Sequence, residues 1–109
     1  MTLSEYQTAV GGWSIKNFGG QPSYRPLLGV AEEVGELCHA HLKSEQGIRV
    51  NEDHFAAKCD AVGDIIIYLC DYCAREGINI TVALASAWNE VSARDWTKHK
   101  EKGTNEPRS

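Results

Sequence analysis

The sequence contains no apolar run of the length that a membrane-spanning helix needs, about 18 residues or more. Its first ten residues, MTLSEYQTAV, lack a basic region followed by an apolar run, so we expect no signal peptide. Basic residues are also few: 11 Lys and Arg stand against 15 Asp and Glu, for a formal net charge of -4. Because nucleic-acid-binding domains usually carry a basic patch, we expect no nucleic-acid polymer as a partner. The missing apolar run likewise leads us to expect no membrane partner.

Strand signals and disulfide signals are scarce as well. The only β-branched run, IIIYL at residues 65–69, lies inside a long helical pattern. The four cysteines, Cys38, Cys59, Cys70 and Cys73, fall in helical patterns and not in the loop-rich sequence of a secreted disulfide scaffold. We therefore expect reduced cysteines and a cytoplasmic location.

Helical periodicity accounts for most of the chain. The length of 109 residues suits one domain, which we place at residues 1–102, with a polar tail at 103–109. Four helices are expected, at about residues 4–18, 26–44, 52–76 and 79–100. Ser4 and Asn51 are the expected N-caps of the first and third helices, and Gly77 is the expected end of the third. The predicted fold class is all-α and four-helix-bundle-like.

Three carboxylates, Glu32, Glu33 and Glu36, lie within one turn of the second predicted helix, where like charges repel one another. An apolar stripe at helical spacing is formed by Leu27, Val30, Val34, Leu37 and His41. Glu33 and Glu36 lie beside this stripe and share a sector with Gly29 and Ala40. The small side chains there leave a groove into which the carboxylates can point.

The third predicted helix repeats this arrangement with Asp60 and Asp64, which lie four residues apart on one face beside Ala57 and Ala61. Asp64 is surrounded by apolar residues in DAVGDIIIYL, and a carboxylate in such a place is costly unless it is paired or metal-bound. If the two helices pack antiparallel, the two acid sets converge. Hard oxygen donors of this kind suit Mg²⁺, with Mn²⁺ as a substitute. The alternative is a solvated acidic helix surface, which is common.

The acidic motifs carry a resemblance to a known family. EEVGE at residues 32–36 followed by DAVGDIIIYL at residues 60–69 resembles the signature of the MazG-like, all-α nucleoside triphosphate pyrophosphohydrolases, E-E-x-x-E and then E-x-x-D on the next helix. Two further segments are also similar to this group, GGQPSYRPLLGVAEE and WNEVSARDWTKHK. The resemblance therefore spans roughly residues 13–100. The signature has Glu where this sequence has Ala61. Asp60 stands one residue earlier on the same helix face, and we expect it to take the place of that Glu.

The resemblance implies Mg²⁺-dependent hydrolysis of a nucleoside triphosphate to a monophosphate and pyrophosphate. The expected substrate is a deoxynucleoside triphosphate, and the expected role is house-cleaning of the nucleotide pool. It implies that the metal ligands are Glu33, Glu36, Asp60 and Asp64. Glu32 is then either a further ligand or, like Glu33, a candidate for the base that takes a proton from water. The resemblance also implies a homodimer or homotetramer, and a chain of this length has a limited core of its own.

For the substrate, Trp13, Asn17 and Phe18 are the residues expected to hold the base by stacking and a polar edge. The alternative for an aromatic residue at helical spacing is core packing. Arg94 and Lys98 are the expected phosphate contacts. The alternative for these two is a basic helix end that is favourable to the helix dipole.

Three rival interpretations remain. A ferritin-like di-iron site needs two Glu-x-x-His pairs, and only Glu36 and His39 supply one. A zinc site could use Cys38 and His41 with Cys70 and Cys73, but both pairs lie within helices, which favours buried cysteines that act as small apolar residues. The third rival is a non-catalytic helical bundle that binds metal weakly and associates with protein.

Overall fold

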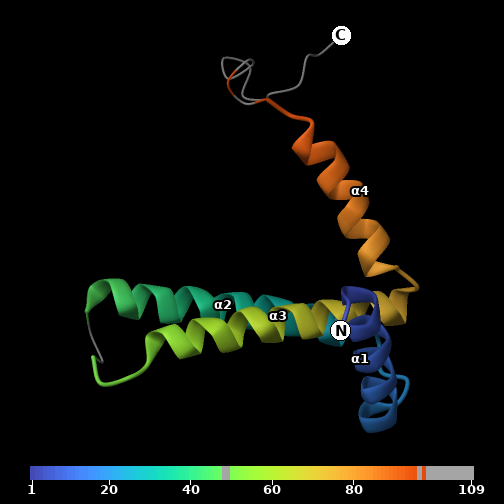
Figure 1. Cartoon of the computed structure of the whole chain (residues 1–109). Coiled ribbons are helices and arrows are strands. Elements are labelled where there is room, and N and C mark those ends of the chain that lie inside the picture. Colours follow the sequence, from blue (N-terminus) through green and yellow to red (C-terminus); the bar gives the residue numbers. More distant parts are fainter. Residues whose placement is uncertain (48–49, 96, 98–109) are drawn as a thin grey trace.

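The computed structural model describes residues 1–47, 50–95 and 97. Four helices make up this part: α1 (Leu3–Phe18), α2 (Tyr24–Gln46), α3 (His54–Glu76) and α4 (Ile80–Ser92). The described residues contain no strand, so the prediction of an all-α chain is confirmed. The expected tail at 103–109 lies outside them. Figure 1 shows α2 and α3 side by side as a long antiparallel hairpin, with α1 across one end and α4 leading away.

Capping residues at the helix termini explain where α1 and α3 begin and where α3 ends. Thr2, not Ser4, caps α1, because its hydroxyl accepts from the Glu5 N–H while the Glu5 carboxylate accepts from the Thr2 N–H. Asp53, not Asn51, caps α3 by accepting from the Ala56 N–H. Gly77 ends α3 at φ 71°, a left-handed conformation that glycine adopts without strain, as expected.

Two other boundaries differ from the sequence prediction. α2 begins at Tyr24, two residues before Pro26, and runs to Gln46. α4 ends at Ser92 and not near Lys100, and residues 94–95 are not helical. The helical periodicity of WNEVSARDWTKHK therefore overstates the length of this helix.

Small residues bring α2 and α3 close together. A Cβ atom on Gly29 would lie 2.5 Å from the ring of Tyr68, so only glycine permits this approach. Ala40 of α2 and Ala61 of α3 are buried further along the hairpin, at 7 % and 3 % exposure. The expected groove beside Gly29 and Ala40 is therefore the interface between the two helices.

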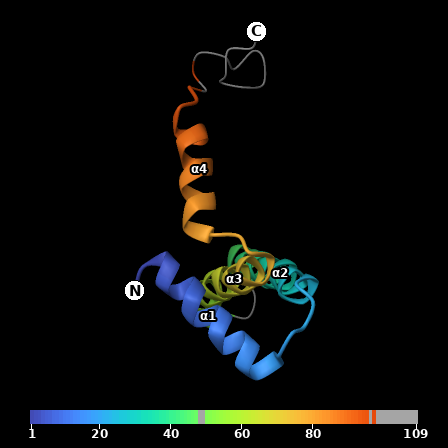
Figure 2. The same ribbon diagram turned by 90° about the vertical axis from the view of Figure 1, so that its right-hand side faces the viewer.

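The described part of the chain buries no large aliphatic or aromatic side chain. Leu27 and Val34 of the expected apolar stripe are exposed, and so is His41, because α2 turns its glycine and alanine side toward α3. On α4 no residue is buried, and Trp88 is 63 % exposed. Figure 2 shows α4 projecting away from the hairpin. None of the helices described is both long and apolar enough to cross a membrane.

Candidate functional site

Two acids of α2 and two acids of α3 come together in one pocket of about 400 Å³ between the two helices. We call it the acidic pocket, and its lining consists of Glu33, Glu36, His39, Ala40, Lys43, Glu52, His54, Ala57, Asp60, Ala61 and Asp64. All four carboxylates expected to bind metal, Glu33, Glu36, Asp60 and Asp64, are among them. The antiparallel packing of α2 and α3 produces this convergence, as the helix-face argument predicted.

The acidic pocket concentrates negative charge, because its lining has five carboxylates and one lysine. Partial burial of Glu33, followed by the nearby charges of Asp64, Glu36 and Glu32, raises the pKa of the Glu33 carboxyl above its ordinary value. Among the described residues, no Lys or Arg forms an ion pair with the four carboxylates. A bound cation would remove this repulsion.

The donor set fits a hard divalent cation, although the side chains are not gathered around one point. No group of three His, Cys, Asp or Glu side chains within residues 1–47, 50–95 and 97 is arranged to hold a metal ion directly. Magnesium commonly keeps several waters and takes only one or two carboxylates. An open pocket lined by carboxylates from two helices is compatible with that manner of binding.

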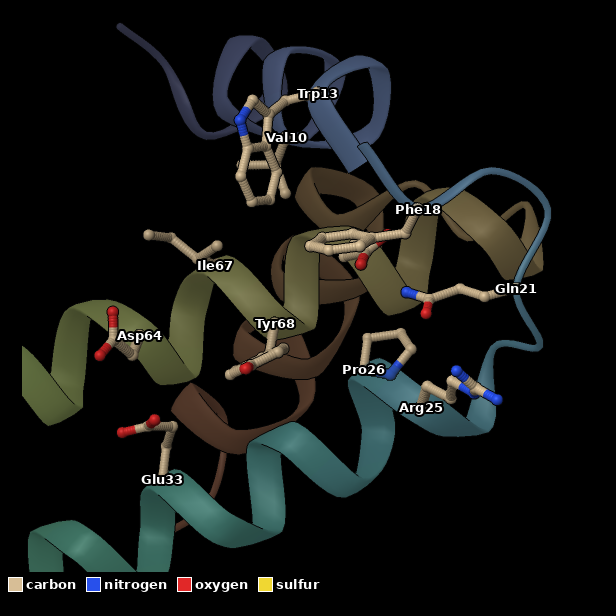
Figure 3. Close-up of a pocket in the computed structure, with 11 residues that line it drawn as sticks. Val10, Trp13, Phe18, Gln21, Arg25, Pro26, Glu33, Asp64, Ile67 and Tyr68 are labelled. Carbon is tan, nitrogen blue, oxygen red and sulfur yellow. The ribbon is translucent and has the colours of Figure 1, made fainter. Parts of the chain in front are cut away.

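A second pocket of about 470 Å³ adjoins the first, between α1 and the hairpin. We call it the aromatic pocket, and its lining consists of Val10, Trp13, Phe18, Gln21, Arg25, Pro26, Glu33, Asp64, Ile67, Tyr68 and Asp71. Figure 3 shows Trp13, Phe18, Ile67 and Tyr68 around its interior, with Glu33 and Asp64 together at one end. Glu33 and Asp64 line both pockets, so the acidic and aromatic pockets are adjacent and share these two carboxylates.

The aromatic wall is partly open to solvent. The rings of Trp13 and Phe18 meet edge to face, with centroids 5.5 Å apart and planes at 84°. Each of these residues is 55 % exposed, so neither serves as a core residue in the single chain. Their place in the pocket leaves faces available for a planar ligand.

Several expected site residues lie elsewhere. Glu32 lines neither pocket, although its charge contributes to the raised pKa of Glu33. Asn17 also lines neither, because its side-chain N–H donates to the Trp13 carbonyl at 2.8 Å. Arg94 is absent from both linings and pairs with Glu90 at 3.4 Å, so the structure does not bring it to the acids. Lys98 lies outside the described residues.

Some pocket residues were not anticipated from the sequence. Tyr68 lies four residues after Asp64, and Lys43 lies seven after Glu36, so helical spacing could have found both. Gln21 and Arg25 lie in or beside the connection between α1 and α2, where periodicity carries no signal. Lys43 is the one lysine or arginine among the described residues that line the acidic pocket.

The cysteines behave in two ways. Cys70 and Cys73 are buried, and burial raises the pKa of both thiols, as expected for cysteines that pack as small apolar residues. Cys38 is exposed, and so is Cys59. All four are free. The burial of one pair and the exposure of Cys38 do not favour a shared zinc site.

The geometry does not favour a ferritin-like di-iron site. Glu36 and His39 both line the acidic pocket, but α3 has Gly63 and Ile67 where a second Glu-x-x-His pair would place its histidines.

Comparison of the chain with protein-family models, with curated proteins and with solved structures finds no match. The fold and the site therefore define a class only in general terms: an all-α chain with an acidic pocket and an aromatic pocket that share two carboxylates.

Proposed function

We propose that the protein hydrolyses a nucleoside triphosphate to a monophosphate and pyrophosphate in a Mg²⁺-dependent reaction, with deoxynucleoside triphosphates as the expected substrates. The sharing of Glu33 and Asp64 by the two adjacent pockets carries this proposal. A nucleotide has an aromatic base at one end and a metal-binding phosphate chain at the other. The two pockets supply, in the same order, stacking surfaces and hard oxygen donors.

Each end of the substrate has candidate contacts in this chain. Trp13 and Phe18 offer aromatic surface to the base, on the side of the site away from Glu36. In the acidic pocket, Glu36, Asp60 and Asp64 are the proposed metal ligands. Lys43, which lines that pocket and is half-buried, replaces Arg94 as the proposed phosphate contact.

The reaction adds water across a phosphoanhydride bond. The water oxygen forms a bond to phosphorus, the bridging P–O bond breaks, and pyrophosphate leaves. Mg²⁺, when bound, neutralises phosphate charge and activates water. Glu33 is the proposed acceptor of the proton released by water, because it lies where the two pockets meet, whereas Glu32 lines neither.

Association with further copies is part of this proposal. The exposed apolar residues of α3 and α4, and the absence of a buried large side chain in the described chain, support a homodimer or homotetramer. Light scattering coupled to size exclusion gives the mass in solution. A monomer at micromolar concentration would refute the assembly while leaving the two pockets as they are.

The test of the activity is a screen of ribonucleoside and deoxynucleoside triphosphates with Mg²⁺, with ion chromatography to separate pyrophosphate from phosphate. We expect monophosphate and pyrophosphate in equal amounts, and no product in chelator. Glu36→Gln is expected to lose turnover. Glu45→Gln is the matched control, because Glu45 is on the same helix and lines neither pocket.

A non-catalytic role in protein association is the second candidate, and the exposure of Val82, Leu84, Trp88 and Val91 on α4 favours it. The same screen separates the two functions. Absence of turnover for every triphosphate, together with a stable oligomer, would replace the enzymatic proposal by this one.

A further inference from the structure

Gln21 places an amide at the inner surface of the aromatic pocket. It lies in the connection between α1 and α2, is half-buried, and lines the pocket with Phe18 and Pro26. Figure 3 shows its amide directed into the pocket between these two residues. Within the described residues the amide makes no hydrogen bond of its own. A half-buried amide has donor and acceptor capacity that a ligand can use.

The backbone of this connection is held by Arg75 of α3. The Nη1 atom of Arg75 donates to the carbonyl of Gln21 at 2.9 Å and to that of Gly19 at 3.1 Å. One guanidinium nitrogen therefore contacts two points of this connection, whose Gly19 N–H also donates to the Ile15 carbonyl at 2.8 Å. The contact restrains the backbone of Gln21.

Arg75 is itself fixed by a buried network. Its Nε donates to Asp71 Oδ1 at 2.9 Å, and its Nη2 donates to Ser14 Oγ at 2.7 Å. Ser14 in turn donates to Asp71 Oδ2 at 2.8 Å. Ser14 is fully buried, and the side chains of Arg75 and Asp71 are only 8 % and 9 % exposed. The network thus connects α1, the connection that carries Gln21, and α3 on one side of the aromatic pocket.

A purely structural role does not account for this chemistry by itself. Buried ion pairs can often be replaced by apolar residues without loss of stability. A planar guanidinium, however, presents several donors in fixed directions, so it can hold two carbonyls, a hydroxyl and a carboxylate at once. That combination fixes the position of the Gln21 amide more sharply than apolar packing would.

We propose that Gln21 determines base specificity and that Arg75 is its positioning residue. This inference rests on the proposed nucleotide-binding function. The ligand is a nucleobase stacked against the aromatic wall, with an adjacent donor and acceptor on its edge facing Gln21. A carboxamide pairs with such an edge through two hydrogen bonds. A base with the wrong edge leaves those groups unpaired, and a loss of about 10-fold in affinity or more follows.

The test measures binding of nucleoside monophosphates carrying adenine, guanine, cytosine, uracil and thymine, by isothermal titration in chelator. We expect the wild type to prefer one base by about 10-fold, and Gln21→Leu to bind all five with similar affinity through the remaining stacking. Gln46→Leu is the matched control, because Gln46 ends α2 and lines neither pocket. Its preference should equal that of the wild type.

Arg75→Lys tests the positioning role, because it keeps the positive charge beside Asp71 but loses the planar donor arrangement. We expect the base preference to fall while circular dichroism remains that of the wild type. If Arg75→Lys does not fold, Gln21→Leu still decides the matter. An unchanged preference in Gln21→Leu, or a wild type that binds no monophosphate or binds all equally, would overturn the inference.

Turnover distinguishes this inference from the proposed function. Triphosphate hydrolysis by the wild type, with the same base ratios in Gln21→Leu, refutes the role of Gln21 and leaves the enzyme intact. Loss of binding preference in Gln21→Leu, without hydrolysis of any triphosphate, supports the role of Gln21 and refutes the enzyme.

Discussion

Helix α3 carries two acids in different surroundings, the buried Asp71 and the exposed Asp64. Asp71 is surrounded by partners of the chain itself, because the Ser14 hydroxyl and the Arg75 guanidinium satisfy both of its oxygens. Asp64, seven residues earlier, faces Glu33 without a Lys or Arg partner among the described residues. Asp71 is thus paired within the fold, whereas Asp64 is one of the acids that we propose to bind a metal ion.

The largest expected effect comes from removing an acid of the acidic pocket. Asp64→Asn and Glu36→Gln should each lower turnover by about 1,000-fold, since a metal ion contributes several kcal/mol to such reactions. The melting temperature in chelator should stay the same or rise, because one of several repelling charges is gone. Turnover and melting are measured on the same preparations. Unchanged turnover with a lower melting temperature would make these acids structural.

Removing Arg75, the partner of Asp71, should instead lower the stability of the fold. Arg75→Met leaves Asp71 buried without its cation, which typically costs about 3 kcal/mol or more in free energy of unfolding. Urea denaturation followed by circular dichroism measures this loss. Arg25→Met is the matched control, because Arg25 is exposed and forms no ion pair with a described residue. Equal stability of the two variants would contradict the structural role of Arg75.

A smaller effect is expected at Asp60, which lines the acidic pocket beside the buried Ala61. Asp60→Asn should raise the Mg²⁺ concentration for half-maximal turnover by about 10-fold, the lower end of the effect expected when a group that supports a metal site is lost. Ala61→Glu should weaken triphosphate binding, because it adds a carboxylate to a crowded anionic pocket. Magnesium titrations of turnover decide both. A wild-type metal requirement in Asp60→Asn, with tighter metal binding in Ala61→Glu, would show that Asp60 is a solvated residue.

The smallest effect concerns pH. The native pKa of Glu33 is raised above 4.5, so the native state holds this proton more tightly than the unfolded chain does. In chelator, the stability of the wild type relative to Glu33→Gln should therefore fall as pH rises from 4.5 through the native pKa, and then level off. The lowered pKa of Glu5 acts below 4.5 and is common to both proteins, so it cancels in the difference. A difference in melting temperature that does not vary with pH would contradict the charge crowding around Glu33.

The acids of the acidic pocket and the contacts of Arg75 also differ in how far the sequence reveals them. Glu33, Glu36, Asp60 and Asp64 are predictable because helical spacing fixes which residues of a helix share a face. The contacts of Arg75 are not, because Ser14 and Gln21 lie 61 and 54 residues away and meet it only through the crossing of α1 over α3. Helical periodicity does not predict how two helices cross.

Helix ends show the same limit. Gly77 is predictable because a left-handed residue after a helical run favours glycine. The predicted N-caps of α1 and α3, Ser4 and Asn51, each lie two residues from the observed caps. Thr2 and Asp53 are as suitable chemically, so the sequence alone does not choose between them. The length of α4 could not be read from periodicity, since residues 94–95 leave the helix although the pattern continues.

We propose above all that the acidic pocket is a divalent-cation site, and a Mg²⁺ titration of the melting temperature is the test of this proposal. We expect Mg²⁺ to stabilise the wild type in a saturable manner, as a ligand that binds the native state does. Asp64→Asn should lose this stabilisation, and Glu45→Gln should retain it. A melting temperature that does not respond to Mg²⁺, or an equal response in wild type and Asp64→Asn, would contradict the claim.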